Sequence, residues 1–421
     1  MPSTSTPSDG IRRVLRAPQV LWVLVAAQVG RLPSASGALA LLLFARQSLS
    51  LAAAGLLVAA YTASMAVGAP LLARAVDRWR QPPVLWISAV LSGAGFGFVA
   101  TSTLGVAGAV VGAAVAGLGT PPLEACLRSL WPDLLPPAAV PAAYALDVAV
   151  QEVIFVVGPL STLLAVTVGG PAAGLALAAL LQLAGTAVFV RAPSVRAWRG
   201  VPAVRHWAGP LRAPRFTVLL AGVACTGVAV GGIAVAVTAY AEAAGDRHLA
   251  GWLLAAQAAG ALAGGLLYTR VGPGGPGRLP LLAAGLAFGF VPLLLAPRPA
   301  LMAVLLAISG LALPPLLTAI FLKVDQVTVP GTAAEAFAWV ATAFAVGSAA
   351  GSALTGLVVS NGVRYGLSLA PVAALLSTAV MVAFARNTQA PVGSAGLPTG
   401  PVPATGGLGE SAPAEGRTSE G

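Results

Sequence analysis

Four ionisable side chains stand inside long apolar runs of this sequence, and they are the residues best placed to do chemistry. Arg31, Glu124, Asp147 and Glu152 have mainly alanine, valine, leucine and glycine around them. A charge in such surroundings is costly unless it is paired, and it commonly belongs to an ion pathway or a proton relay. The pattern predicts buried ion pairs whose carboxylates can gain and lose a proton.

The composition places these residues in a membrane. The chain has 421 residues, of which 57% are hydrophobic and 9% charged, and its mean hydropathy is +0.89. Soluble globular proteins carry about 25% charged residues, so a soluble globule is excluded. The net charge of +10 is explained by arginines in cytoplasmic loops, and we expect the lipid bilayer rather than nucleic acid as the partner.

Twelve apolar runs are long enough to cross the ~30 Å hydrocarbon core, which takes about 20 helical residues. We therefore predict an all-α polytopic membrane protein with twelve transmembrane helices. The runs lie near residues 20–44, 51–75, 84–101, 106–128, 142–167, 172–190, 217–241, 249–269, 279–297, 301–322, 336–360 and 366–385.

An internal repeat divides these helices into two bundles of six. Segment 15–18 returns at 211–214, and 54–74 matches 250–270 at the same shift of 196 residues. A consistent register over several helices indicates a parallel duplication. The predicted parts are a cytoplasmic tail at 1–19, a bundle at 20–190, a basic cytoplasmic linker at 191–216, a second bundle at 217–385 and a disordered cytoplasmic tail at 386–421.

The basic residues predict the orientation in the membrane. If both termini are cytoplasmic, the cytoplasmic segments contain 18 Lys and Arg residues and the outer loops only four. Because Lys and Arg accumulate on the cytoplasmic side, we expect a multi-pass protein of the cytoplasmic membrane with both ends inside.

The loop between the second and third spans carries a motif that resembles the major facilitator superfamily. Asp77 and Arg78 match the Asp-Arg pair of the family's 2–3 loop, and Gly158-Pro159 looks like the fifth-span signature of its twelve-span drug:proton antiporters. The likeness covers about residues 1–386. Ala113 stands where those antiporters have an arginine, so the match to them is partial.

The resemblance implies a secondary active transporter that works by alternating access. It favours proton-coupled efflux of a small, largely lipophilic molecule, and it implies a cytoplasmic gate formed by Asp77 and Arg78, to which we add Arg128. Uptake of a sugar-like nutrient is the alternative, and a membrane ligand sensor that transports nothing is the alternative from another class.

The depths of the charges suggest how they pair. Arg31 and Glu152 both lie about 15 Å into their spans, so we expect them to face each other, with Glu152 as the proton-coupling residue. Asp147 is the competing candidate. Glu124 is one turn from Arg128, so it either pairs with it locally or takes part in transport and proton coupling.

Several further residues complete the predicted site. The amides of Gln28, Gln151 and Gln257 could contact the substrate or a neighbouring helix. Breaks or hinges are predicted in three helices, at these residues: Pro121, Pro122, Gly158, Pro159, Pro314 and Pro315.

An enzyme or a cofactor protein is not predicted. Cys126 and Cys225 stand in separate apolar runs, and His206 and His248 in separate loops, so they form no ligand cluster for a metal. We expect no cofactor, no metal and a monomer.

Overall fold

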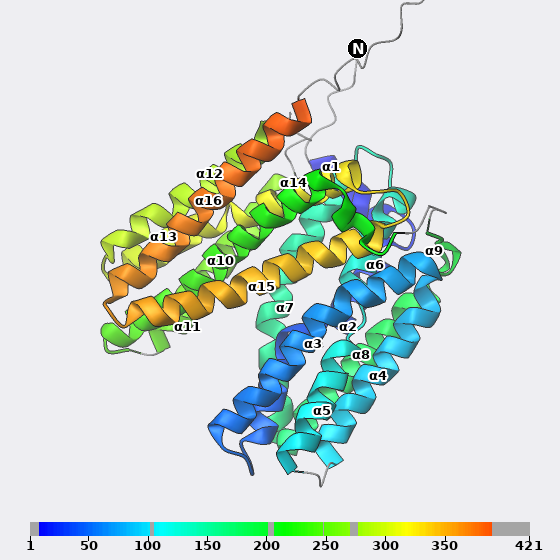
Figure 1. Ribbon diagram of the computed structural model, residues 1–421, viewed down its shortest axis with the longest axis horizontal. Coiled ribbons are helices and arrows are strands. Elements are labelled where there is room, and N and C mark those ends of the chain that lie inside the picture. The colour runs from blue at the N-terminus through cyan, green and yellow to red at the C-terminus, as the bar shows by residue number, and fades with distance from the viewer. Residues whose placement is uncertain (1–7, 102–104, 201–205, 247, 270–276, 390–421) are drawn as a thin grey trace, which may run out of the picture. The chain divides into compact units, whose positions relative to one another are not determined.

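The computed structural model describes residues 8–101, 105–200, 206–246, 248–269 and 277–389, and all the regular structure in these residues is helical. Figure 1 shows the helices, which keep its labels below. The tail predicted from 386 lies outside the described residues after 389. Within the predicted N-terminal tail, Ser8–Arg16 forms the helix α1.

The first bundle consists of seven helices that make six spans, because α5 and α6 follow one another through a single span. They are α2 (Val20–Ala45), α3 (Leu51–Arg78), α4 (Gln81–Thr101), α5 (Gly105–Leu118), α6 (Leu123–Leu134), α7 (Val140–Gly169) and α8 (Pro171–Arg191).

The second bundle repeats this arrangement, and short helices lie in the linker that precedes it. The linker contains α9 (Pro193–Ala197) and η1 (Gly209–Arg212). The bundle itself contains α10 (Pro214–Ala243), α11 (His248–Tyr268), α12 (Arg278–Phe290) with η2 (Val291–Leu295), α13 (Pro299–Gly310), α14 (Leu313–Val327), α15 (Ala333–Val359) and α16 (Val363–Gln389).

Length and hydropathy identify eleven membrane-spanning segments among the described residues. The helix that they leave out is α2, which has 26 residues and is long enough to span. It carries Gln28, Arg31 and two serines, which lower its hydropathy. With α2 counted, the twelve predicted spans are present in two bundles.

Local sequence explains where the helices begin. Ser50 caps α3, since its Oγ accepts a hydrogen bond from the Ala53 amide at 3.2 Å. Gly170 joins α7 to α8 with a φ of 76°, a conformation that glycine adopts without strain. Pro171 then opens α8, where the missing N–H costs nothing.

Small residues bring the helices into backbone contact at equivalent places in both bundles. A Cβ on Gly68 of α3 would collide with the backbone of Leu118 in α5, and one on Gly264 of α11 would collide with Leu311, just after α13. Gly68 and Gly264 are repeat partners at the shift of 196. The duplication seen in the sequence is therefore a duplication of packing.

Two of the three predicted helix interruptions occur. The span made by α5 and α6 is interrupted between Leu118 and Leu123, with Pro121 and Pro122 in the gap. Pro314 and Pro315 lie in the first turn of α14, immediately after the turn that ends α13.

The predicted break at Gly158 and Pro159 is absent, because α7 runs without interruption through both. Gly158 instead lets α7 approach α2, since a Cβ there would come within 3.2 Å of the Leu32 carbonyl. The glycine therefore serves helix packing in this structure.

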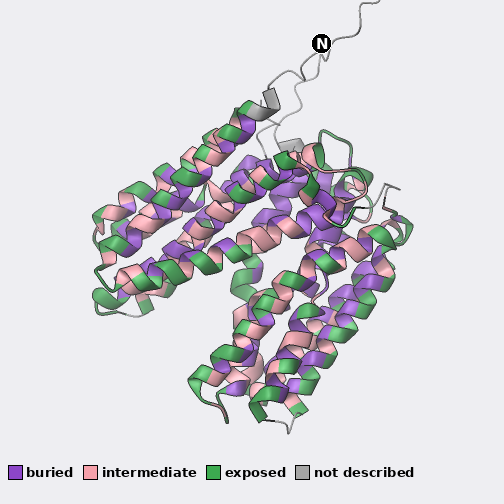
Figure 2. Ribbon diagram, in the orientation of Figure 1, coloured by how far each residue is buried: buried purple, intermediate pink, exposed green. Residues whose placement is uncertain are grey.

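The bundles contact each other through α3, α6 and α7 of the first and α11, α14 and α15 of the second. Figure 2 shows buried positions where helices face one another and exposed positions on their outward sides. Those outward sides carry many exposed leucines, valines and phenylalanines, as expected for surfaces in contact with lipid.

Candidate functional site

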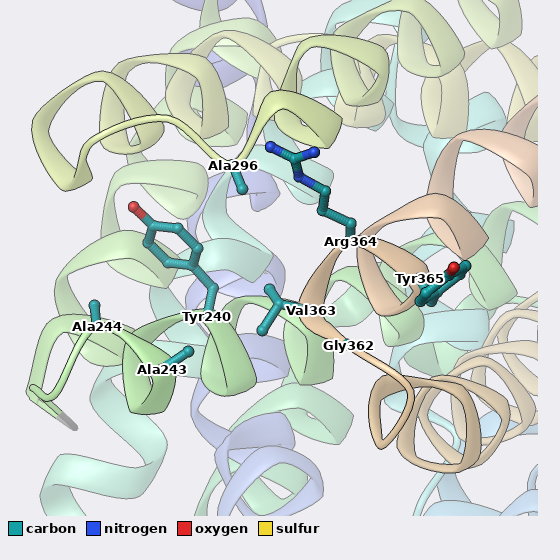
Figure 3. Close-up of a pocket in the computed structure, with 8 residues that line it drawn as sticks. All are labelled: Tyr240, Ala243, Ala244, Ala296, Gly362, Val363, Arg364 and Tyr365. Atoms are coloured by element: carbon teal, nitrogen blue, oxygen red, sulfur yellow. The ribbon is translucent and has the colours of Figure 1, made fainter.

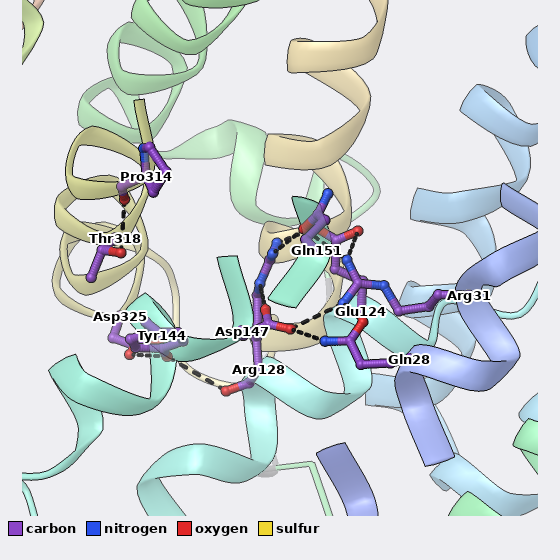
Figure 4. A network of polar contacts seen from close by, with 10 residues as sticks. All are labelled: Gln28, Arg31, Glu124, Arg128, Tyr144, Asp147, Gln151, Pro314, Thr318 and Asp325. Atoms are coloured by element: carbon purple, nitrogen blue, oxygen red, sulfur yellow. Dashed lines mark hydrogen bonds and ion pairs between the residues drawn. The ribbon is translucent and has the colours of Figure 1, made fainter. Parts of the chain in front are cut away.

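Three helices of the first bundle bring six polar residues together (Figure 4). On each helix the two residues are three or four positions apart, so they share one face. The pairs are Gln28 and Arg31 on α2, Glu124 and Arg128 on α6, and Asp147 and Gln151 on α7.

Two arginines and two carboxylates form a closed set of ion pairs, which we call the charge cluster: Arg31, Glu124, Arg128 and Asp147. Arg31 lies 3.0 Å from an oxygen of Asp147 and 3.0 Å from one of Glu124. Arg128 donates from Nε to Asp147 at 2.8 Å, and its Nη1 pairs with Glu124. Each carboxylate thus meets both guanidinium groups, and the cluster is neutral when all four are ionised.

The glutamines complete the hydrogen bonding of the cluster. Gln28 donates to Asp147 at 3.2 Å and accepts from Arg31 at 3.2 Å. The Gln151 carbonyl accepts from Arg31 at 2.8 Å and from Arg128 at 3.2 Å. Gln257 lies apart, on α11 of the other bundle, where its backbone packs against Gly310.

The members of the cluster differ in exposure. Asp147 is 0% exposed, Arg128 1% and Arg31 6%, whereas Glu124 is 26% exposed. Buried ions are tolerated only when they are paired and hydrogen-bonded, a condition that this set meets. Glu124 is the member that water or a solute can reach.

The predicted pair of Arg31 and Glu152 is wrong. Within the described residues Glu152 has no ion-pair partner, because it follows Gln151 by one position and so points away from the face that α7 presents to α2. Helical side chains also lean toward the helix N-terminus. Arg31 therefore reaches Asp147. Asp147 lies about 6 Å nearer to the start of α7 than Arg31 lies to the start of α2.

The charge cluster touches the second bundle directly. The guanidinium of Arg128 lies 3.8 Å from the ring centroid of Phe321 on α14, within cation–π range. Tyr144 of α7 packs between Phe321 and Phe337, at centroid distances of 5.9 and 5.8 Å, and donates to Asp325 at 2.9 Å. The charge cluster is therefore in direct contact with the bundle interface.

A second set of contacts joins the end of α3 to the start of α15. The Asp77 carboxylate accepts hydrogen bonds from the backbone amides of Ala334 at 3.1 Å and Glu335 at 2.8 Å. It thus caps a helix of the other bundle at the positive end of its dipole. Asp77 thus bridges the two bundles, and its role as a cytoplasmic gate stays a prediction.

The arginines at this junction differ from the prediction. Arg74 forms the ion pair across the bundles, 2.5 Å from Glu335, while Arg78 is exposed and lies over its neighbour Trp79. Arg128 belongs to the charge cluster instead. We call Arg74, Asp77 and Glu335 the α3–α15 latch.

Sequence reasoning missed Glu335 and Arg74 as bridging residues. Glu335 lies one residue before the span predicted at 336–360, yet an acid in the first turn is a common feature of helix starts. Arg74 ends the best-matched repeat segment, which was a usable signal. Phe321 and Tyr144 carried no signal, since an aromatic residue in an apolar helix is ordinary.

Other features do not repeat this chemistry. A pocket of about 450 Å³ between the end of α10 and the start of α16 is lined mainly by Tyr240, Tyr365 and small residues, with Arg364 as its charged side chain (Figure 3). The described residues contain no group of three His, Cys, Asp or Glu side chains able to hold a metal. The charge cluster is therefore the candidate site.

Comparison with known proteins identifies the fold. The sequence model of the Major Facilitator Superfamily matches residues 24–245, which is more than half of the chain. None of the curated proteins compared with the chain matches it.

Solved structures of transporters are similar over almost their whole length. A bacterial homologue of the iron transporter ferroportin, in an outward-facing state, has a TM-score of 0.66 and 14% identity, covering 86% of this chain and 98% of the other. The proton:xylose symporter XylE gives 0.65 and 15%, covering 90% and 96%. The human organic anion transporter MFSD10 gives 0.62 and 15%, covering 88% and 99%.

The family match, the twelve spans in two repeated bundles and the paired charges within them agree with one another. The chain belongs to the Major Facilitator Superfamily, and it is a multi-pass membrane transporter rather than an enzyme.

Proposed function

We propose that this transporter is a proton-coupled exporter of a small, largely lipophilic molecule, working by alternating access, and that the charge cluster is its coupling site. The observation that supports this most is the closed set of two arginines and two carboxylates within membrane-spanning helices. Ionisable groups at such depth characterise proton and substrate pathways.

Proton coupling follows from how the cluster is balanced. Protonation of Glu124, the part-exposed member, removes one negative charge and leaves both arginines facing Asp147 alone. An unbalanced charge is unfavourable in a dry interior, so the conformation that lets water reach the cluster gains population. Arg128 carries this change to the second bundle through Phe321.

Alternating access requires two conformations, and the α3–α15 latch would stabilise the one in which the bundles are closed at its end. In this structure, the described hydrogen bonds and ion pairs between the bundles come from the half of the molecule that carries α1 and the linker. Similarity to a ferroportin homologue described as outward-facing fits closure on that side. Transport would open the latch and close the opposite side.

The substrate class is drawn from what the site lacks. Gln28 and Gln151 are both occupied in the cluster, and Gln257 stands apart from it, so among the residues that the structure describes few amides remain at this site to orient a hydrophilic solute. Both carboxylates are already balanced by arginines, which disfavours a metal cation as cargo. A lipophilic molecule fits these surroundings best.

Import of a sugar-like nutrient is the second candidate. It is supported by the similarity to a proton:xylose symporter and to FucP, described as a transporter of the same superfamily in its outward conformation. A ligand sensor without transport is the remaining alternative.

Transport of a fluorescent lipophilic dye into proteoliposomes that carry a pH gradient tests the proposal. Movement of the dye against the direction of the protons supports antiport. Movement with the protons supports a symporter, and binding without movement supports a sensor.

The same assay distinguishes the candidate coupling residues. Glu124→Gln and Asp147→Asn should abolish gradient-driven accumulation, while Glu152→Gln should keep it. Loss in Glu152→Gln alone would return the role to Glu152.

We also propose that the protein is a monomer in the cytoplasmic membrane, with both termini and the linker in the cytoplasm. The support for this orientation is the distribution of arginine and lysine, 18 against four. No nucleic-acid partner is proposed.

A further inference from the structure

A groove runs along the outer side of the first bundle, between the start of α2 and the end of α8. Its volume is about 520 Å³, and it is lined by apolar side chains and one glycine: Leu21, Trp22, Val25, Ala26, Val29, Ala184, Gly185 and Val188. Leu21, Trp22, Val25 and Val188 are exposed. The groove is therefore open on the surface that faces the lipid.

Close backbone packing builds the floor of this groove. A Cβ on Gly185 would collide with the backbone of Gly30 and Ala26, so the two helices meet there without side chains between them. Toward the helix ends Trp22 spans the gap, and its Nε1 donates to the Val188 carbonyl at 3.0 Å. The tryptophan is thus fixed at the groove's mouth, where such rings mark the membrane–water boundary.

The mouth of the groove is basic. Arg191 ends α8 three residues after Val188, and Arg16 ends α1 four residues before α2 begins; both are exposed. The segment after α8 lies against the start of α2, because the Ser194 amide donates to the side-chain oxygen of Gln19 at 3.0 Å. Arg196 and Arg199 of the same region donate to backbone carbonyls, whereas the exposed guanidinium groups of Arg16 and Arg191 make no such bond in the described part of the chain.

We propose that this groove binds one anionic phospholipid of the surrounding bilayer, with an acyl chain between α2 and α8 and the phosphate at Arg191 and Arg16. An apolar groove that opens at a basic membrane boundary matches both halves of such a lipid, whereas a zwitterionic lipid leaves the arginine charge less well balanced. The site is separate from the charge cluster, and it does not rest on the proposed transport reaction.

Native mass spectrometry of the purified protein with phosphatidylglycerol and phosphatidylcholine tests the site. The wild type should retain one phosphatidylglycerol in preference to phosphatidylcholine. Ala184→Phe fills the groove from its exposed side and should remove the retained lipid, whereas Ala176→Phe, an exposed position farther along α8, should not. Arg191→Gln should lower the retention about fivefold, and Arg46→Gln at the far end of α2 should leave it unchanged.

Fluorescence gives a readout that does not depend on a groove-filling variant. The fluorescence of Trp22 is obtained as the difference between the wild type and Trp22→Phe. It should be quenched more strongly by phosphatidylglycerol with brominated acyl chains than by phosphatidylcholine with the same brominated chains. Equal quenching by the two lipids, equal retention of both, or full retention in Ala184→Phe would each overturn the proposal.

Discussion

At the charge cluster every member is balanced by partners on other helices or one turn away. Asp147 contacts Arg31 and Arg128, and Glu124 contacts the same two. Removing any one member therefore leaves a net charge among buried groups, and such a loss typically costs about 3–5 kcal/mol. The stability of the cluster itself therefore depends on the balance of charge more than on any single bond.

Arg31→Gln should lower the melting temperature markedly, because it leaves two carboxylates facing one arginine. The double variant Arg31→Gln with Glu124→Gln restores neutrality and should melt higher than the single variant. Thermal unfolding in detergent measures both, with Arg46→Gln on the exposed end of α2 as the control. A double variant that melts lower than Arg31→Gln would contradict a role for charge balance.

The cluster residues could be named from the sequence, because charges in apolar runs are conspicuous. The local pair of Glu124 and Arg128 was also predicted and is present, but the partners of Arg31 could not be predicted. Depth along a helix is set by counting residues, whereas partner choice depends on which face each residue occupies and on the reach of arginine toward the helix start. For that reason Arg31 was matched to Glu152 by depth, when it pairs with Asp147 and Glu124.

Among the elements, α3 and α15 carry the contact that closes one end of the bundle interface. Asp77 has both carboxylate oxygens on backbone amides of α15, and Arg74 pairs with Glu335 beside it. A cap supplied from another bundle breaks when the bundles separate, so it reports the conformational state.

Asp77→Asn should weaken this cap, because an amide offers one acceptor where the carboxylate offers two and also carries no charge for the helix dipole. Hydrogen exchange at the first turn of α15, residues 333–337, should become faster. Arg78→Gln is the matched control one residue on, with no described contact to α15. Unchanged exchange in Asp77→Asn would show that the cap does not hold the interface.

Helix packing gives a test at the same scale. A Cβ at Gly68 of α3 meets the backbone of Leu118, whereas one at Gly55 of the same helix meets nothing. Gly68→Ala should therefore lower the melting temperature, since backbone atoms must move apart, and Gly55→Ala should leave it unchanged or raise it slightly. Equal melting of the two variants would argue against the close packing of α3 on α5.

The spans could be predicted well from hydropathy, because a helix that crosses a bilayer must be long and apolar. The interruptions at Pro121–Pro122 and Pro314–Pro315 could also be predicted from the sequence, but the break predicted at Gly158-Pro159 is absent. A proline inside a membrane helix can be accommodated without ending it, and only the packing against α2 shows which outcome occurs.

For the whole molecule, the basic linker and both termini are proposed to lie in the cytoplasm. In a background without Cys126 and Cys225, Arg46→Cys should react with a membrane-impermeant maleimide in intact cells. Arg199→Cys in the linker should react only after the cells are permeabilised. The reverse pattern would invert the proposed topology.

The central claim is that protonation of the charge cluster shifts the bundles between two conformations. Spin labels at Trp79 and Gln326, one on each bundle and both exposed, allow the distance between the latched ends to be measured by pulsed electron resonance. In the wild type a short distance should dominate at neutral pH, and a longer one should grow as the pH falls. Glu124→Gln, which imitates the protonated carboxyl, should show the longer distance at every pH, while Glu152→Gln should follow the wild type. The same distances in wild type and Glu124→Gln at all pH values would contradict the claim.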